Sequence, residues 1–277
     1  MKSKFVICIW LICLAVNSVT SQEKIKGNRE VTIKQTYIDN FEAISVGDDF
    51  SIDLVYNSKP SVEIETDDNL HEVIKFEVVD GVLVFTETQR ITSKKVLKIT
   101  LNYGEGFKNI EVKGTAEIRS LTSMELGDAS VSVNDNSRAY LNIRAKNFVF
   151  KSGGKSKTRL NLTADDSKIE ISDDSKLEAL VNSPISEFYL YQRADANIEG
   201  NADTSIIRID NSSNFYGRDY TVKKCTLTAE GSADTTIEVT ESLDLDASGD
   251  TATFLYGEPQ INITKLSGSA KIQKKEG

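Results

Sequence analysis

A repeat of 18 to 19 residues near the C-terminus constrains the fold of this chain more than any other feature. Gly231, Gly249 and Gly268 recur at this interval, each inside a small polar segment. Leu243 follows Gly231 by twelve residues, and Ile261 follows Gly249 by the same number. Short runs of alternating apolar residues that recur at this interval are typical of a β-solenoid, in which equivalent positions of successive coils stack. We therefore predict that Leu243 and Ile261 are neighbours in adjacent coils.

Small polar segments between the alternating runs predict the corners of the coils. Gly, Asn and Asp tolerate left-handed backbone conformations, and this is why they favour corners. The predicted corners before residue 230 are Gly127–Ala129, Gly153–Gly154, Asp165–Ser167, Asp173–Ser175, Gly200–Asp203 and Asn211–Asn214. The pattern predicts an all-β protein in which residues 114–277 form a parallel β-helix of roughly eight coils. An antiparallel β-sandwich is the main alternative, because it also uses short alternating strands.

Residues 22–113 are predicted to form a β-rich portion ahead of the solenoid. The run Lys75–Thr86, interrupted by Asp80 and Gly81, predicts a tight hairpin. The segment Asp67–Ile74 is the one helical candidate, because apolar residues recur in it at helical spacing. We expect this N-terminal portion to cover one open end of the solenoid, since exposed strand edges invite aggregation.

Residues 1–21 have the pattern of a signal peptide. Lys2 and Lys4 precede an apolar run from Phe5 to Val16, and small residues at Val19–Ser21 offer a cleavage site. The apolar run is shorter than the about 20 residues that a membrane-spanning helix needs. The sequence thus predicts export, to the periplasm, the outer membrane surface or the extracellular space, with no transmembrane segment in the mature chain.

Charge and cysteine content limit the partners of the mature chain. The sequence has 33 basic and 42 acidic residues, and loss of Lys2 and Lys4 with the signal leaves 31 basic residues, a net charge of about −11. Such a surface repels nucleic acids and gains nothing from anionic lipids. Cys225 would be the only mature cysteine, so no intramolecular disulfide is possible. Its alternation with Leu227 predicts a buried apolar residue; a reactive thiol is the alternative.

Two blocks of the sequence together resemble the head GIN domain family of exported bacterial proteins, which are often labelled "putative auto-transporter adhesins". The blocks comprise Phe41–Tyr56, Val62–Glu65, Asp67–Leu70 and Val78–Leu83, then Gly231–Asp234, Asp246–Asp250 and Leu266–Ala270. The resemblance implies a right-handed, single-stranded parallel β-helix preceded by a β-rich N-terminal portion, and it implies no reaction and no ligand. The chain departs from the family where Ser-Gly-Ser-Gly corners are usual, because Asp165–Ser167 and Asp173–Ser175 stand there. This departure weakens any argument that the backbone amides of the corners bind a ligand.

Few residues suggest chemistry. His71 is the only histidine, so any histidine-based triad or zinc site would have to use it. Asp165, Asp166, Asp173 and Asp174 form the best candidate for calcium if successive coils bring their corners together, although turns favour Asp for conformational reasons alone. The sequence thus indicates no catalytic set, no cofactor site and no metal site.

Two further groups could contact a glycan. A basic cluster could meet an acidic glycan, or could simply be a solvated surface: Lys151, Lys155, Lys157 and Arg159. An aromatic set could form a sugar platform, or could be ordinary strand packing: Tyr189, Tyr191, Phe215, Tyr216 and Tyr220.

The sequence therefore favours a non-catalytic, adhesin-like module of the cell envelope or cell surface that binds a glycan or a surface protein through one β-helix face. A polysaccharide-active lyase or hydrolase on the same scaffold is the alternative. The oligomeric state stays open.

Overall fold

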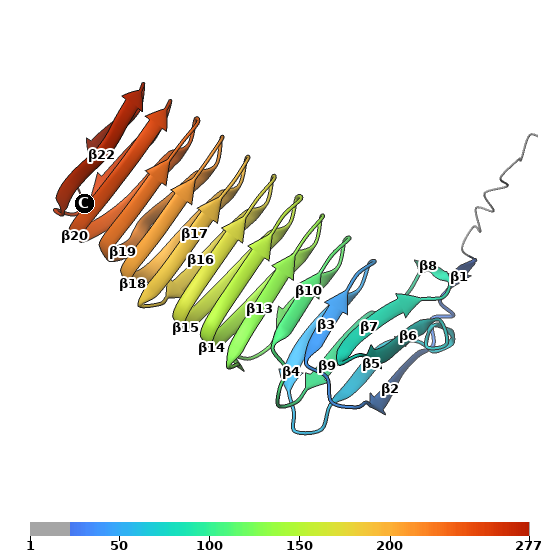
Figure 1. Cartoon of the computed structure of the whole chain (residues 1–277). Coiled ribbons are helices and arrows are strands. Elements are labelled where there is room, and N and C mark those ends of the chain that lie inside the picture. Colours follow the sequence, from blue (N-terminus) through green and yellow to red (C-terminus); the bar gives the residue numbers. More distant parts are fainter. Residues whose placement is uncertain (1–22, 277) are drawn as a thin grey trace, which may run out of the picture.

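The fold is a row of stacked β-coils with a smaller group of strands at its N-terminal end (Figure 1). This is a computed structural model that describes residues 23–276. Its described residues contain no α-helix and a single 3-10 turn, η1 (Asp68–Leu70). The predicted signal peptide, residues 1–21, lies outside the described residues. Within the described part of the chain, no helix is both long and apolar enough for a membrane crossing.

Each coil consists of two strand segments that face each other across the core. Face I contains β3 (Ala43–Val46), β10 (Asn109–Val112), β13 (Asp128–Val133), β17 (Ile185–Leu190) and β22 (Gln260–Gly268). Face II contains β4 (Ser51–Tyr56), β11 (Glu117–Ser120), β16 (Lys176–Asn182), β21 (Ala252–Tyr256) and β23 (Lys271–Lys274). Five long strands bend and belong to both faces: β14 (Arg138–Ser152), β15 (Lys157–Ile171), β18 (Asp195–Ile209), β19 (Asn214–Ala229) and β20 (Asp234–Gly249). The short β12 (Met124–Glu125) pairs with the middle of β14.

All strand pairs between successive coils are parallel, which confirms the predicted solenoid and rules out the antiparallel sandwich. The predicted register is also confirmed, because Leu243 pairs with Ile261 in the next coil. Ile237 likewise pairs with Leu255. The stack has about nine turns, close to the number that the repeat length predicts.

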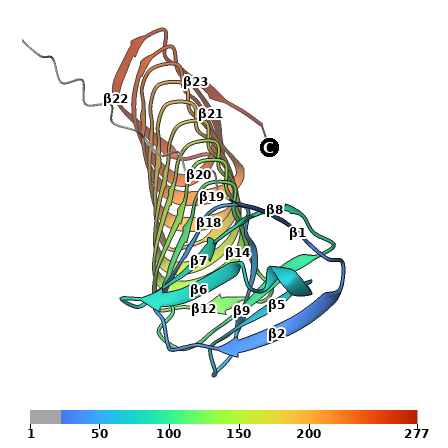
Figure 2. The same cartoon turned by 90° about the vertical axis from the view of Figure 1, so that its right-hand side faces the viewer.

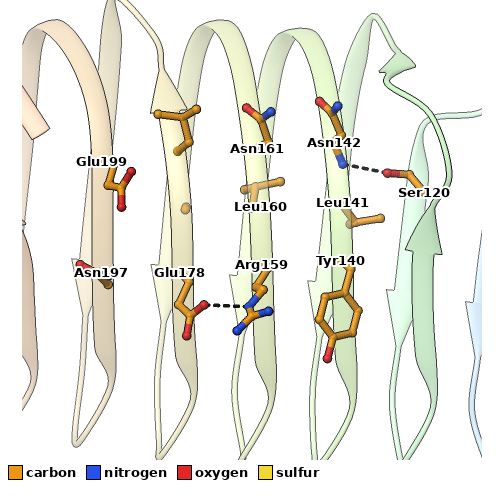
Figure 3. Close-up of a pocket in the computed structure, with 12 residues that line it drawn as sticks. Ser120, Tyr140, Leu141, Asn142, Arg159, Leu160, Asn161, Glu178, Asn197 and Glu199 are labelled. Carbon is orange, nitrogen blue, oxygen red and sulfur yellow. Dashed lines mark hydrogen bonds and ion pairs between the residues drawn. The ribbon is translucent and has the colours of Figure 1, made fainter. Parts of the chain in front are cut away.

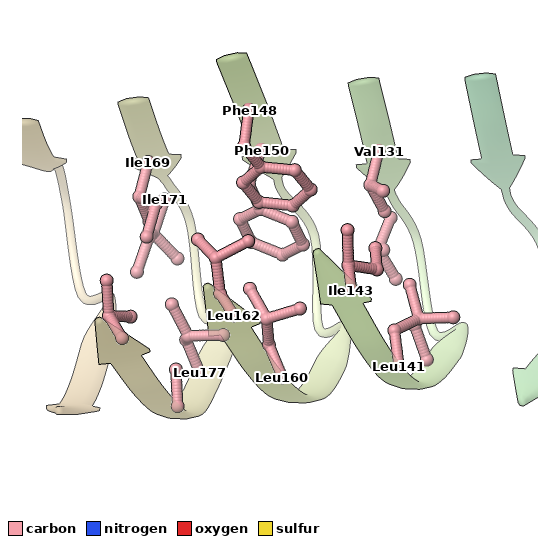
Figure 4. Close-up of a cluster of buried hydrophobic side chains, with 14 of the residues drawn as sticks. Val131, Leu141, Ile143, Phe148, Phe150, Leu160, Leu162, Ile169, Ile171 and Leu177 are labelled. Atoms are coloured by element: carbon pink, nitrogen blue, oxygen red, sulfur yellow. The ribbon is translucent and has the colours of Figure 1, made fainter. Parts of the chain in front are cut away.

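The core is the flattened space between the two faces. Alternate residues of β15 are buried and exposed along the strand, as a strand with one solvated face requires. Figure 4 shows side chains from face I, such as Phe148 and Phe150, lying opposite side chains from face II, such as Leu160 and Leu162. Except in the last coil, the inward-facing residues thus form one continuous hydrophobic core.

A tight corner joins face I to face II in every coil, and its second residue has a left-handed backbone. Positive φ angles recur at this position in Gly114, Asp135, Gly154, Asp173, Gln192, Asn211, Gly231, Gly249 and Gly268. Corners of adjacent coils are joined by backbone hydrogen bonds, such as Asp174 N–H to the Gly154 carbonyl oxygen at 2.9 Å. Before the last corner, the fourth residue is small and buried, for example Ser175 and Ala194. Glycine, asparagine and aspartate thus occur here because of backbone conformation.

The predicted corners fall at two different places in the coil. Gly153–Gly154, Asp173–Ser175 and Asn211–Asn214 lie at the tight corner. The segments Gly127–Ala129, Asp165–Ser167 and Gly200–Asp203 lie at or beside the opposite bend, where each coil passes from face II to face I. The mixed spacing of about 10 and about 20 residues in the sequence arises from this alternation.

The N-terminal strands extend both faces and end the parallel stack. On face I, β7 (Val82–Glu87) pairs with β3 in parallel, and β6 (Ile74–Val79) pairs with β7 in antiparallel orientation. On face II, β9 (Leu97–Tyr103), β5 (Ser61–Asp67) and β2 (Val31–Tyr37) follow β4 in this order, the last two antiparallel. The strands β1 (Lys24–Lys26) and β8 (Arg90–Ser93) pair separately. Figure 2 shows these strands in front of the coils. That they cover this end of the solenoid stays a prediction.

Local predictions in this portion had mixed outcomes. The hairpin is confirmed, with Asp80 and Gly81 at φ angles of 50° and 78° in its turn. The helix over Asp67–Ile74 is wrong, because only η1 forms there. The Asp67 carboxylate does not cap η1; it accepts hydrogen bonds from the backbone N–H groups of Arg29 and Lys95. These tertiary contacts replace the capping interaction that a longer helix would need.

The division at residues 113 and 114 stays a prediction. The parallel ladder runs through it without interruption, because β3 pairs with β10. At the other end of the stack, β22 leaves Ile261, Ile263 and Leu266 exposed by 43%, 46% and 45%, so no other described element covers their side chains.

Candidate functional site

The four candidate calcium ligands do not meet. Asp173 and Asp174 lie at the tight corner, whereas Asp165 and Asp166 lie at the opposite bend of the same coil. Roughly six strand residues separate the two places, or roughly 20 Å. The described residues hold no group of three His, Cys, Asp or Glu side chains that could bind a metal ion.

Both carboxylates at the tight corner already have partners. The Asp173 carboxylate accepts a hydrogen bond from the Gly154 N–H at 2.7 Å. Asp174 pairs with Arg193 of the next coil at 2.5 Å, and this hydrogen bond lowers the pKa of Asp174. Asp173 and Asp174 therefore act in coil-to-coil contacts.

The basic cluster is divided between two faces and a corner. Lys151 lies on face I, where it pairs with Glu170 at 3.6 Å. Arg159 lies on face II, where its guanidinium donates to Glu178 at 2.8 Å. Lys155 lies at the tight corner between them. The four cations thus form no single basic patch that could hold an acidic glycan.

The aromatic set is divided in the same way. Phe215 and Tyr220 are fully buried and pack edge-on against Phe188, with ring centroids 5.3 and 5.6 Å from it. Tyr189 lies on face I, and Tyr216 lies on face II with 46% of its surface exposed. These residues form no shared platform, and the packing interpretation holds for the two buried rings.

His71 and Cys225 lie far apart in the fold. His71 follows η1 in the N-terminal portion, and its Nε2 atom lies 3.0 Å from the Thr32 hydroxyl oxygen. Partial burial, followed by the nearby Lys34 charge, lowers its pKa. Cys225 lies inside a late coil, where burial raises the pKa of its thiol to about 12. Cys225 is therefore a buried residue, as predicted.

A shallow depression on the outer surface of face II gathers polar side chains from four successive coils (Figure 3). Its volume is about 460 Å³. One row crosses the strands as Tyr140, Arg159, Glu178 and Asn197. A second row, two residues further along each strand, is Asn142, Asn161, Leu180 and Glu199. Members of one row lie about 4.8 Å apart, because they occupy adjacent strands.

Several polar groups of this depression have no partner among the described residues. Arg159 and Glu178 pair with each other. In contrast, the side-chain amides of Asn142, Asn161 and Asn197 and the carboxylate of Glu199 make no hydrogen bond or ion pair with another described residue. Elsewhere on both faces comparable groups are paired across coils, as Lys168 is with Glu187 at 3.6 Å on face I and Asn201 is with Asn182 at 2.6 Å on face II. Face II therefore offers donors and acceptors that are free for a ligand.

Sequence reasoning missed this set because each residue is ordinary by itself. The signal that could have found it is the interval of 19 residues, since Asn142 and Asn161 fall at one position of successive coils.

A stack of parallel coils defines this protein as a β-solenoid. The chain belongs to the family described as "Putative auto-transporter adhesin, head GIN domain", whose model matches residues 40–182 and 186–259. The family resemblance of the sequence is thereby confirmed. No curated protein matches the chain.

Solved structures share the fold. A crystal structure of "a putative adhesin" from Parabacteroides merdae is similar with a TM-score of 0.66 and 18% identity, covering 91% of this chain and 99% of the other. A "putative adhesin" from Parabacteroides distasonis has a TM-score of 0.65 and 17% identity, covering 91% and 100%. A "putative lipid binding protein" from the same organism has a TM-score of 0.64 and 15% identity, with the same coverage. At these identities the likeness shows the fold alone.

Proposed function

We propose that this protein is a non-catalytic, exported binding module that binds a carbohydrate chain through face II. The proposal rests on one observation: polar side chains without protein partners recur across successive coils in the depression of Figure 3. Amide and carboxylate groups can accept and donate hydrogen bonds to sugar hydroxyls, and the ring of Tyr140 can contact the apolar side of a sugar. Rows that repeat from coil to coil suit a ligand that itself repeats.

A chain-like ligand fits this surface better than a protein partner. Stable protein interfaces bury about 800 Å² on each partner and depend on buried aromatic anchors. The depression is shallow, and half of its lining residues are amides or charged groups. The family name and the names of two of the similar structures support an adhesive role, and the predicted signal peptide supports export to the cell envelope or surface.

A glycan array with residues 22–277 would identify the ligand class. The double variant Asn142→Ala and Asn161→Ala should lose at least about tenfold in affinity for the glycan that binds, because two hydrogen-bonding groups disappear from one row. The control is Thr226→Ala, an exposed residue of face I, and it should bind as the unchanged protein does.

The outcomes separate the alternatives. Glycan binding that weakens in the double variant Asn142→Ala and Asn161→Ala supports the proposal. Cleavage of the glycan would instead support a lyase or hydrolase on the same scaffold. Binding that survives the double variant would place the ligand elsewhere.

A further inference from the structure

A deeper pocket lies at the junction between the N-terminal portion and the first coils. Its volume is about 830 Å³, which is in the range of small-molecule sites, about 300 to 1,000 Å³. The end of β4, the end of β9 and the segment 104–108 form one side, and residues 122–128 form the other. It shares no lining residue with the depression on face II.

Aromatic rings form much of the apolar wall. Tyr56, Tyr103 and Phe107 contact one another in turn, with centroid distances of 5.8 Å between the two tyrosines and 4.9 Å between Tyr103 and Phe107. Tyr56 is 50% exposed, so one ring is directly accessible to a ligand. Val55 and Leu126 extend the apolar surface.

The Tyr103 hydroxyl belongs to a buried residue and has no protein partner. The side chain lines the pocket and the residue is only 2% exposed, yet the hydroxyl makes no hydrogen bond to any described residue. The hydroxyl of Tyr220, in contrast, has a protein partner, because it lies 2.6 Å from the Ser186 hydroxyl. The Tyr103 hydroxyl is not among the fully buried polar atoms that lack a partner in the described part of the chain, so it is accessible from the pocket. A molecule in the pocket would supply the partner that Tyr103 lacks.

The rim of the pocket is acidic. Glu105, Glu125 and Asp128 supply three carboxylates. Lys108 is the single lysine of the lining, and Glu42 outside it already pairs with this lysine at 2.5 Å. Glu125 lies 3.7 Å from Arg144, whereas Glu105 has no ion-pair partner among the described residues. The rim therefore repels anions and attracts cations.

We infer that this pocket is a second binding site, for a small organic ammonium ion with an apolar body. The apolar body would contact the ring of Tyr56 and the side chains of Val55 and Leu126. The ammonium group would donate a hydrogen bond to the Tyr103 hydroxyl oxygen and lie near the rim carboxylates. Aromatic rings beside carboxylates suit an ammonium ion, because both the ring face and the carboxylate attract positive charge.

Three probes with one apolar body and different charge test the inference: 3-phenylpropylammonium, 3-phenylpropanol and 3-phenylpropanoate. Calorimetric titration of residues 22–277 at pH 7 should give the tightest binding for the ammonium ion. The carboxylate should bind at least about tenfold more weakly, and this preference should shrink as salt is added.

Two variants identify the pocket as the site. Glu105→Gln, at an exposed residue without an ion-pair partner, should reduce the preference for the ammonium ion over the alcohol about threefold. Tyr103→Phe should weaken ammonium binding about five- to tenfold and keep the fold, since the hydroxyl has no protein partner to lose. Asn161→Ala on face II is the control and should leave all three affinities unchanged.

Equal affinities for the three probes, or no binding at millimolar concentration, would overturn the inference. So would ammonium binding that neither variant changes. Because the pocket and the depression on face II share no lining residue, failure of the glycan experiment leaves this result intact.

Discussion

Replacing Gly154 by alanine should show how far the row of left-handed corners sets the coil-to-coil distance. Gly154 has a φ angle of 69°, and a Cβ atom there would lie 2.7 Å from the Asp135 carbonyl oxygen and 2.8 Å from its Cα. A left-handed conformation costs an L-residue about 1–2 kcal/mol. Relieving the contact requires a shift of packed backbone, which costs about 1–3 kcal/mol more. Gly154→Ala should therefore lower the free energy of unfolding by about 2–5 kcal/mol.

Gly81→Ala is the matched control for this prediction. Gly81 has a similar φ angle of 78°, but no atom lies within 4 Å of the place that a Cβ atom would take there. This variant carries only the conformational cost of about 1–2 kcal/mol, and both variants reduce the entropy of the unfolded chain equally. Chemical unfolding followed by circular dichroism measures both. If the two variants lose the same stability, close stacking of the corners does not limit this fold.

Three further perturbations test the core and its buried polar groups. Phe215→Ala removes the ring that packs against Phe188 and should cost about 3–5 kcal/mol in unfolding free energy, and a cost under about 1 kcal/mol would contradict this packing. Tyr220→Phe removes the hydroxyl beside Ser186 and should lower the unfolding free energy by about 1–2 kcal/mol. Tyr103→Phe should change it by less than about 0.5 kcal/mol. A larger loss for Tyr103→Phe than for Tyr220→Phe would refute the contrast between the two hydroxyls. Burial raises the pKa of Cys225 from 9.0 to about 12, so above pH 9 the unfolded state loses its proton first and stability falls with rising pH. The unfolding free energy should therefore drop between pH 8 and pH 10 by about 1 kcal/mol more in the unchanged protein than in Cys225→Ala, and equal slopes would contradict the buried thiol.

The interior of the solenoid could be predicted from the sequence because it obeys local rules. Inward residues alternate with outward ones, and a corner needs a left-handed residue, so Gly231 and Gly249 reveal the coil length. The pairing of Leu243 with Ile261 follows from that length alone.

The corners before residue 230 were harder to place, because Asp173, Gln192 and Asn211 replace glycine at the left-handed position. The opposite bend uses the same residue types, as Asp165 and Gly200 show. Composition does not distinguish the two places, and this is why the acidic segments seemed able to meet.

The polar rows of face II could have been found only from the interval of 19 residues, whereas the second site depends on contacts that the repeat does not specify. The pocket at Tyr103 forms where the segment 104–108 meets residues 122–128, outside the regular coils. Nothing in the sequence distinguishes Tyr103, which has no partner for its hydroxyl, from Tyr220, which has one.

Inward and outward residues are physically independent of each other. This independence explains why the fold could be predicted from the sequence and why the candidate sites could not. Inward side chains determine whether the coils stack, so their pattern is constrained throughout the chain. An outward side chain affects folding only through its neighbours one coil away, and exposed pairs such as Arg159 with Glu178 contribute little to stability. Asn142 and Asn161 could therefore be replaced at almost no cost to the fold. Rows of unpaired polar groups on such a surface are not needed for stability, which leaves them available for the binding role that we propose.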